Sequence, residues 1–195
     1  MLATGNPGKV AEITGLLAAF DVVPRPAGLE DPVEDGPTLV ANARIKARAV
    51  VAASGEAAVA DDTGLEVDAL DGRPGVTTDR YAGEGATADD NMDRLLSELA
   101  GVPEGRRTAR WRTVALVVHP DGSEVVAEGV CEGTVTEARR GGVGFGYDPV
   151  FVPADGGGRA FSEMTVDEKN ALSHRGRAFR LLAAMLLETS SPDSR

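Results

Sequence analysis

The sequence lacks the features that stabilise secreted proteins or anchor proteins in membranes. It has a single cysteine, Cys131, which excludes an intramolecular disulfide and makes a reducing cytosol the simplest compartment. No apolar run approaches the ~18 residues that a membrane-spanning helix needs, and the N-terminus has no signal-peptide layout. These absences predict a soluble, cytoplasmic protein with no membrane partner.

Positive charge is also scarce. Asp and Glu number 31 against 20 Lys and Arg, which gives a net charge of −11 and argues against a nucleic-acid partner, because such a surface needs a basic patch. The net charge does not exclude a small anionic ligand that is held by a few local cations. Aromatic residues make up only 4%, but 42% hydrophobic residues suffice for a core. We expect one two-lobed domain over residues 1–189 and a disordered tail at 190–195.

A short run of small apolar residues leads directly into two adjacent carboxylates. Residues 57–60 are followed by Asp61, Asp62, Thr63 and Gly64. Such a run is typical of a buried strand, and ligands of open α/β sheets bind at the carboxyl ends of strands. Two adjacent acids repel each other unless a cation or a proton lies nearby. The pattern indicates a functional site, with a plain turn capped by Asp62 as the alternative.

The N-terminus has a second pattern that suits an anion. After a short strand at residues 1–3, the sequence Thr-Gly-Asn-Pro-Gly-Lys at residues 4–9 precedes an amphipathic helix over 10–20. Backbone N–H groups and the positive end of the helix dipole attract anions at such a turn, and Lys9 adds a cation. The turn does not match a Walker A loop. An ordinary strand–helix connection is the alternative.

Caps and apolar stripes predict the remaining elements of an α/β fold. Thr38 begins a helix that ends at Ser54, and Thr87 begins another. Residues 111–119 and 124–130 read as a β-hairpin around a Pro-Asp-Gly turn. Further strands are expected at residues 22–23, 65–70, 132–135 and 150–152.

Only three of the 20 basic residues are lysines. Lys9 lies in the N-terminal turn and Lys46 lies beside the apolar stripe of the second helix. Lys169 lies on a short helix before Ser173, which caps the last helix. Lysine is a compact point charge suited to phosphate. Three lysines and two carboxylates therefore indicate a site for polyphosphate and a metal ion.

Four short motifs carry a resemblance to a known family. They are Thr-Gly-Asn-Pro-Gly-Lys at residues 4–9, Ala-Asp-Asp-Thr-Gly at 60–64, Phe-Gly-Tyr-Asp-Pro at 145–149 and Ser-His-Arg-Gly at 173–176. In this order they resemble the inosine triphosphate pyrophosphatase family over nearly the whole chain. The resemblance implies an elongated mixed β-sheet flanked by helices, two lobes around a central cleft, and a homodimer. It also implies hydrolysis of the non-standard purine nucleotides dITP, ITP and XTP to the monophosphate and pyrophosphate, with Mg²⁺ as cofactor.

The family's roles carry over onto matching positions. Asp62 would be the general base and a metal ligand, and the second metal ligand is either Glu34 or Asp61. The triphosphate would be bound by Thr4, Gly5, Asn6, Pro7, Gly8 and Lys9, with Lys46 and Lys169 assisting. Thr63 would contact the substrate, and the base would be held by Phe145, Gly146, Tyr147, Asp148, His174 and Arg175.

Two positions depart from the family pattern. Ala41 precedes Asn42 where Glu is frequent, and Thr78-Asp79 stands where Ser-Ala is common. The sequence offers neither a zinc-ligand cluster nor a G-x-S-x-G serine nucleophile. Two other functions fit the same motifs: a nucleotide-binding sensor without catalysis, and a phosphatase that releases orthophosphate.

Overall fold

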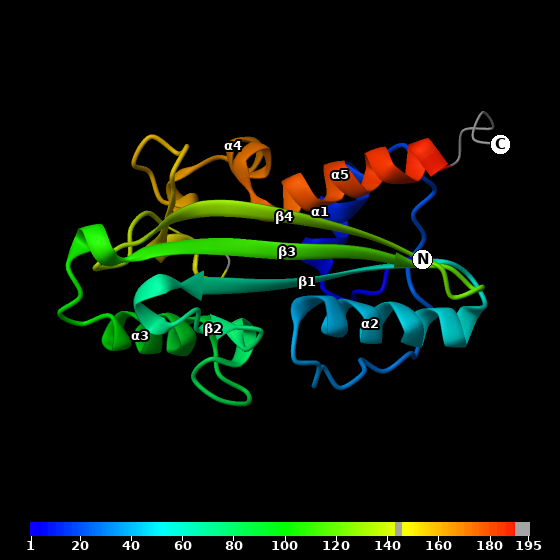
Figure 1. The fold of residues 1–195 in the computed structure, drawn as a ribbon, viewed down its shortest axis with the longest axis horizontal. Coiled ribbons are helices and arrows are strands. Elements are labelled where there is room, and N and C mark those ends of the chain that lie inside the picture. The colour runs from blue at the N-terminus through cyan, green and yellow to red at the C-terminus, as the bar shows by residue number, and fades with distance from the viewer. Residues whose placement is uncertain (143–145, 190–195) are drawn as a thin grey trace. The chain divides into compact units, whose positions relative to one another are not determined.

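The computed structural model describes residues 1–142 and 146–189 and confirms an α/β fold (Figure 1). Its five-stranded sheet has the order β2-β1-β3-β4-β5. The strands are β1 (Ala58–Val67), β2 (Pro74–Gly75), β3 (Thr108–Val118), β4 (Glu124–Val135) and β5 (Phe151–Pro153). The helices are α1 (Pro7–Leu16), α2 (Leu39–Ser54), α3 (Ala88–Glu98), α4 (Val166–Leu172) and α5 (His174–Thr189). Within the two described ranges, none of the helices has the length and apolar character that crossing a membrane requires.

The five-stranded sheet is antiparallel, and the parallel pairing expected of a mixed sheet is present as isolated bridges. β1 pairs antiparallel with β2, and β4 pairs antiparallel with β5. Leu2 forms parallel bridges to Pro24 and to Val59. These single bridges replace the short strands predicted at residues 1–3 and 22–23.

The predicted helix boundaries hold where a cap defines them. The Thr38 hydroxyl accepts a hydrogen bond from the Ala41 N–H, and Gly55 ends α2 in the left-handed conformation with φ of 73°. Only glycine adopts that conformation without strain. Thr87 begins α3 in a reciprocal capping box with Asp90, as the Thr-x-x-Asp spacing favours.

Two strands are longer than the sequence pattern suggested. β1 continues through Asp61 and Asp62 to Val67, so the prediction that these acids follow the end of a strand is wrong. β4 runs without a break to Val135, so residues 132–135 are not a separate strand. In both places the residues stay extended because neighbouring strands satisfy the hydrogen bonds of their backbone groups. This pairing cannot be predicted from the polar side chains of the segment.

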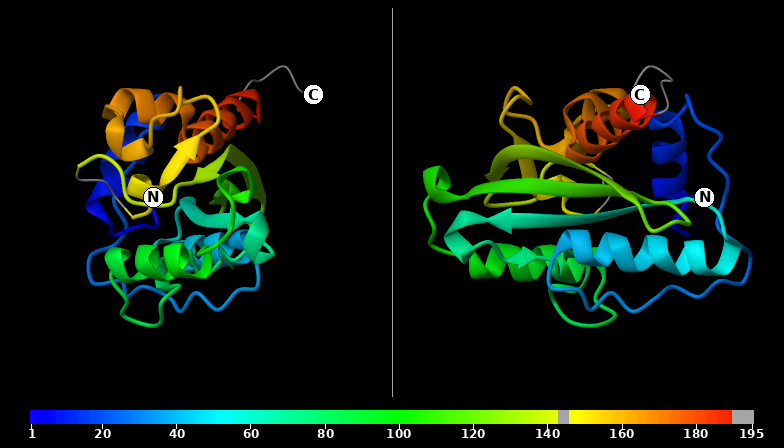
Figure 2. Two further views of the ribbon diagram at one scale, coloured as in Figure 1. Left: turned by 90° about the vertical axis from the view of Figure 1, so that its left-hand side faces the viewer. Right: turned by 45° about the vertical axis from the view of Figure 1, so that its right-hand side comes forward.

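The chain divides into two compact units. Unit 1 comprises Met1–Asp62, Thr113–Gly129 and the chain from Arg175 onward, and unit 2 comprises Thr63–Arg112 and Val130–His174. In unit 1, Ile13 of α1 and Phe179 and Leu182 of α5 join a buried cluster with Val59 and Val117 of the strands. Figure 2 shows α2 on the other side of these strands. The face of α2 that is buried carries Leu39, Ala43, Ala47 and Val50, as its stripe predicted.

Unit 2 has its own core. Met92 and Leu95 of α3 pack with Leu65 of β1, Phe151 of β5 and Phe161. The guanidinium of the buried Arg107 donates to the carbonyls of Leu99, Val102 and Thr136 at 2.8, 3.0 and 2.9 Å. Each unit therefore has its own packed core, which includes strands of the sheet.

Candidate functional site

Three segments of unit 1 end at the same place. The parallel bridges of Leu2 to Pro24 and Val59 align three short extended segments in one direction. Beyond them come Arg25, the turn at residues 4–9, and the Asp61–Asp62 pair. The carboxyl ends of parallel segments are where α/β proteins bind ligands. Although β1 itself continues, the geometry still brings the predicted turn and the predicted acids together.

The two acids point to opposite faces of β1. Successive side chains alternate along a strand, and their partners lie on different helices. Asp61 contacts Lys9 of α1 and Arg175 of α5, whereas Asp62 contacts Lys46 of α2. Each carboxylate therefore has its own cations, and the Asx-turn alternative for Asp62 is excluded.

The first cluster surrounds Asp61, which is buried. Its Oδ2 atom accepts from Lys9 Nζ at 3.0 Å and from Arg175 Nε at 3.4 Å, and Arg175 Nη1 lies 2.7 Å from Glu12 Oε2. Burial alone would raise the pKa of Asp61, but attraction to Lys9, Arg175 and Lys46 outweighs burial and lowers it. Asp61 is thus a permanent carboxylate that holds two cations in place.

The second cluster joins Asp62 to the loop before α2. Lys46 Nζ donates to Asp62 Oδ1 at 3.0 Å and to Glu34 Oε2 at 2.8 Å. Burial raises the pKa of Asp62, and Lys46 offsets this only in part. In the part of the chain that the structure describes, Asp62 Oδ2 is buried and accepts no hydrogen bond. Asp62 therefore has one oxygen held and one available to a ligand.

The opposite pKa shifts predict unequal effects of two neighbouring substitutions on stability. Asp61→Asn should lower the free energy of unfolding by about 3–5 kcal/mol, because it leaves buried cations without their carboxylate. A lowered pKa adds stability above the unfolded value near 4, and this stability is lost as pH falls toward the folded value. Urea unfolding at pH 7 measures the first effect, and a series of urea unfolding curves at pH values from about 4 downward measures the second.

Asp62→Asn is the matched control for Asp61→Asn, and the expected contrast is a large loss of stability against a small one. A raised pKa means that the folded state disfavours the charged carboxylate near neutral pH, so removing the charge should cost little stability. Equal losses in the two variants at pH 7 would contradict the assignment of Asp61 as the structural acid of the pair.

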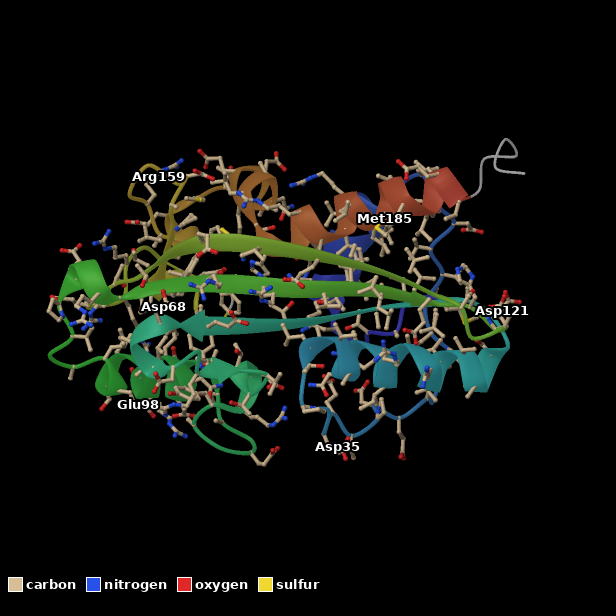
Figure 3. All side chains as sticks on the ribbon, viewed as in Figure 1. Asp35, Asp68, Glu98, Asp121, Arg159 and Met185 are labelled. Atoms are coloured by element: carbon tan, nitrogen blue, oxygen red, sulfur yellow. The ribbon has the colours of Figure 1, made fainter. Side chains whose placement is uncertain are left out.

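Glu34 is placed by a close backbone contact. The Gly36 N–H donates to Oδ1 of the buried Asn42 at 2.8 Å. A Cβ at Gly36 would lie 2.6 Å from that oxygen, so only glycine fits there. The neighbouring Asp35 is exposed and points away from α2 (Figure 3). The fold thus selects Glu34, and not Asp35, as the partner of Lys46.

The clusters fit a divalent cation shared with a ligand. Together they contain one more carboxylate than cation. The cations are Lys9, Lys46 and Arg175, and the carboxylates are Glu12, Glu34, Asp61 and Asp62. Among the described residues, no three Asp, Glu, His or Cys side chains group around one metal position. Glu34 and Asp62, which share Lys46, are the two carboxylates that could hold a divalent cation together with ligand oxygens.

The turn at residues 4–9 is stabilised by its own side chains. Asn6 Oδ1 accepts from the N–H groups of Gly8 and Lys9 at 2.9 and 3.4 Å, and the Asn6 N–H donates to Thr4 Oγ1. Pro7 is the first helical residue, where its missing N–H costs nothing. Two of the donors predicted for an anion are therefore bonded to Asn6, whose amide must turn aside if they are to bind one.

The predicted base-binding residues lie in unit 2, apart from Arg175. Tyr147 donates its hydroxyl to the Thr78 carbonyl at 2.8 Å, and Lys169 Nζ lies 2.7 Å from Asp148 Oδ2. His174 is buried and stacks on Trp111 with ring centroids 5.0 Å apart and planes 15° from parallel. Thr63 lies on β1, Gly146 has φ of 58°, and Phe145 lies outside the described residues.

Four residues that contact the predicted site residues were not predicted from the sequence. Glu12 follows Lys9 by three positions on the same helix face, a spacing that could have shown it. Asn42 is a polar residue beside an apolar helix stripe, and this position could have indicated a buried hydrogen-bonding role. Arg25, beside Gly5 in unit 1, and Trp111, beside His174 in unit 2, are each placed by long-range packing, for which the sequence has no local signal.

Comparison with known proteins identifies the family of this chain. The model of the Ham1 family matches residues 1–185. The dITP/XTP pyrophosphatase of Methylococcus capsulatus is 49% identical over 95% of this chain and 94% of its own length. The dITP/XTP pyrophosphatase of Nitratidesulfovibrio vulgaris is 48% identical over 93% and 92%. A HAM1 protein from Coxiella burnetii has a similar structure, with a TM-score of 0.87, 36% identity and coverage of 96% and 97%. These matches confirm the resemblance carried by the four motifs, and this chain belongs to the Ham1 family.

Proposed function

We propose that this protein hydrolyses the non-standard purine nucleotides dITP, ITP and XTP to the monophosphate and pyrophosphate, and so clears them from the nucleotide pool. The observation that carries the proposal is the similarity to dITP/XTP pyrophosphatases, at 49% and 48% identity over nearly the whole chain. The paired lysines and carboxylates of unit 1 support the same chemistry, because phosphoryl transfer depends on positioning and charge neutralisation.

Asp62 is the proposed general base. A water oxygen bonds to one phosphorus of the α–β anhydride, and the bond from that phosphorus to the bridging oxygen breaks with its electron pair. Asp62 accepts the proton of the water at Oδ2, the oxygen without a hydrogen bond among the described residues. Lys46 keeps the carboxylate oriented through Oδ1 at 3.0 Å. The raised pKa of Asp62 makes it a better base than an exposed aspartate.

Mg²⁺ is the proposed cofactor, and Glu34 and Asp62 would hold it. Both carboxylates share Lys46, whereas Asp61 points to the other face of β1 and is already bonded to two cations. This arrangement favours Glu34 over Asp61 as the second ligand. When bound, Mg²⁺ neutralises phosphate charge.

The remaining assignments follow the family resemblance. Thr4, Gly5, Asn6, Pro7, Gly8, Lys9, Lys46 and Lys169 are proposed to bind the triphosphate. Thr63 is proposed to contact the substrate, and Phe145, Gly146, Tyr147, Asp148, His174 and Arg175 to bind the base. A homodimer is proposed on the same resemblance, and a cytoplasmic location on the single cysteine.

A panel of nucleotides, assayed separately for pyrophosphate and orthophosphate, tests the proposal. We expect pyrophosphate and monophosphate in equal amounts from ITP, dITP and XTP. Orthophosphate as the first product would indicate a phosphatase. Tight nucleotide binding without any product would indicate a sensor.

Lys9 provides a test of the turn at residues 4–9. Lys9→Ala should lower kcat/KM for ITP by about 10- to 100-fold, mainly through KM, because a charged hydrogen bond is worth ~1.5–3 kcal/mol. Lys9→Arg should restore part of the loss, since the charge returns with a different geometry. Arg48→Ala, which removes an exposed cation of α2, is the control. A Lys9→Ala enzyme with wild-type kcat/KM would mean that the turn is only a connection.

A further inference from the structure

Arg25 lies beside the turn at residues 4–9 because of the first parallel bridge. Leu2 donates its N–H to the Val23 carbonyl at 2.9 Å and forms a bridge to Pro24. Arg25 is the next residue along the chain, at the end of the segment where the turn also begins. Its position is therefore fixed by backbone pairing and not by a flexible surface loop.

The guanidinium of Arg25 lies against Gly5. A Cβ added at Gly5 would be 2.9 Å from Arg25 Nη2 and 3.3 Å from Cζ. Without a side chain at residue 5, the planar group comes within reach of the backbone of the turn. Arg25 thus adds a second cation to the turn that already carries Lys9.

The partner of Arg25 sets it apart from the other cations of the site. Within the described residues, its ion pair is with Asp31, whose side chain is 74% exposed, while the Arg25 side chain is 20% exposed. Exposed ion pairs contribute little stability and exchange readily with solvent. By contrast, Lys9 and Arg175 share the buried Asp61. A polyphosphate can therefore replace Asp31 at little cost.

An additional cation at the turn would improve the charge balance. The two clusters around Asp61 and Asp62 hold one carboxylate more than cations, so they do not by themselves neutralise an anion. A triphosphate brings several further negative charges to the same place. The arginine fork presents donors in a plane and binds two phosphate oxygens at once.

We propose that Arg25 is an additional phosphate-binding residue, which holds the pyrophosphate part of the substrate and the pyrophosphate product against the turn at residues 4–9. This inference rests on the proposed function. It concerns a residue that lies outside all four sequence motifs.

The test compares Arg25→Gln, Arg25→Lys and Asp31→Asn. Arg25→Gln should lower kcat/KM for ITP by about 10- to 100-fold and weaken inhibition by pyrophosphate by a similar factor. Inhibition by IMP, which lacks that group, should not change. Arg25→Lys should fall between wild type and Arg25→Gln, because it keeps the charge and loses the fork.

Asp31→Asn separates phosphate binding from a structural role. It breaks the same ion pair but frees Arg25, so pyrophosphate inhibition should stay the same or become stronger. Equal losses in Asp31→Asn and Arg25→Gln would show that only the ion pair matters and would overturn the inference. Unchanged pyrophosphate inhibition in Arg25→Gln would overturn it too.

Calorimetric binding of pyrophosphate keeps this test independent of turnover. If the wild type binds pyrophosphate but hydrolyses none of the nucleotides, the proposed function fails, and the affinity of Arg25→Gln still decides the role of Arg25. A wild-type protein that does not bind pyrophosphate would overturn the inference directly.

Discussion

Asp62→Asn should lower kcat for ITP by ~10²–10⁴-fold, the usual cost of losing a general base. The amide matches the carboxylate in shape but cannot take a proton from water at Oδ2. Lys46 retains Glu34 as a partner in this variant, so the loop before α2 should stay in place. Steady-state rates and urea unfolding of the same sample separate lost chemistry from lost folding.

The pH profile identifies the role of Asp62 more specifically. A base acts in its deprotonated form, so wild-type kcat/KM should fall as pH drops through the pKa of Asp62. In the protein without metal, burial raises this pKa above that of an exposed aspartate near 3.9, whereas Mg²⁺ bound to the same carboxylate would lower it. The acid limb of the profile should disappear in Asp62→Asn. A variant that keeps more than about a tenth of the wild-type rate, well short of the expected loss, would remove Asp62 from the mechanism.

Glu34→Gln and Asp35→Asn are a matched pair for the metal. Glu34 shares Lys46 with Asp62, while Asp35 is exposed and points away from α2. Glu34→Gln should raise the Mg²⁺ concentration needed for half-maximal rate, and Asp35→Asn should not change it. An equal Mg²⁺ requirement in both variants and wild type would exclude Glu34 as a ligand.

The elements that local chemistry determines could be predicted from the sequence. The α2 helix begins at Thr38 and ends at Gly55 because side-chain capping and a left-handed glycine act within a few residues. Two of the three lysines, Lys9 and Lys46, each contact one of the two central carboxylates, whereas Lys169 contacts Asp148. Such information is contained in the residues themselves.

Contacts made by distant segments could not be predicted. The extended conformation of Asp61 and Asp62 depends on strand pairing, and their separation onto two faces follows only once β1 is known to continue. The pairing of Arg175 with Glu12 joins residues 163 positions apart. Arg25 likewise reaches Gly5 only through the Leu2–Pro24 bridge. These are the contacts that convert separate motifs into a site.

The largest expected effect concerns the base. Hypoxanthine and xanthine present an oxygen at C6 and a donor at N1, whereas adenine presents an amino donor and an acceptor. A site built from hydrogen-bond donors would leave both sides unpaired with adenine, a mismatch worth ~10⁴–10⁵-fold in kcat/KM. We therefore expect kcat/KM for ITP, dITP and XTP to be far higher than for ATP, with little influence of the 2′-hydroxyl. GTP, which shares the C6 oxygen, should lie between them.

The donors proposed for that oxygen are His174 and Arg175. His174 is held flat against Trp111, which fixes its ring plane. Arg175 Nε and Nη1 are engaged by Asp61 and Glu12, so Nη2 is the guanidinium nitrogen that has no such bond within the described residues. Because Arg175 also supports the buried Asp61, Arg175→Ala should cost stability as well as selectivity.

His174→Ala is accordingly the cleaner test of base recognition. It should lower kcat/KM for ITP more than for ATP and so narrow their ratio, while a loss of folding alone would lower both equally. Trp111 is the one tryptophan of the chain and stacks on His174, so its fluorescence reports directly on the stacked pair. In nucleotide titrations, the variant that lacks the imidazole should bind ITP more weakly than the wild type does, whereas its affinity for ATP should not change. Comparable kcat/KM for ATP and ITP in the wild type would contradict a donor-lined site, however active the enzyme proved to be.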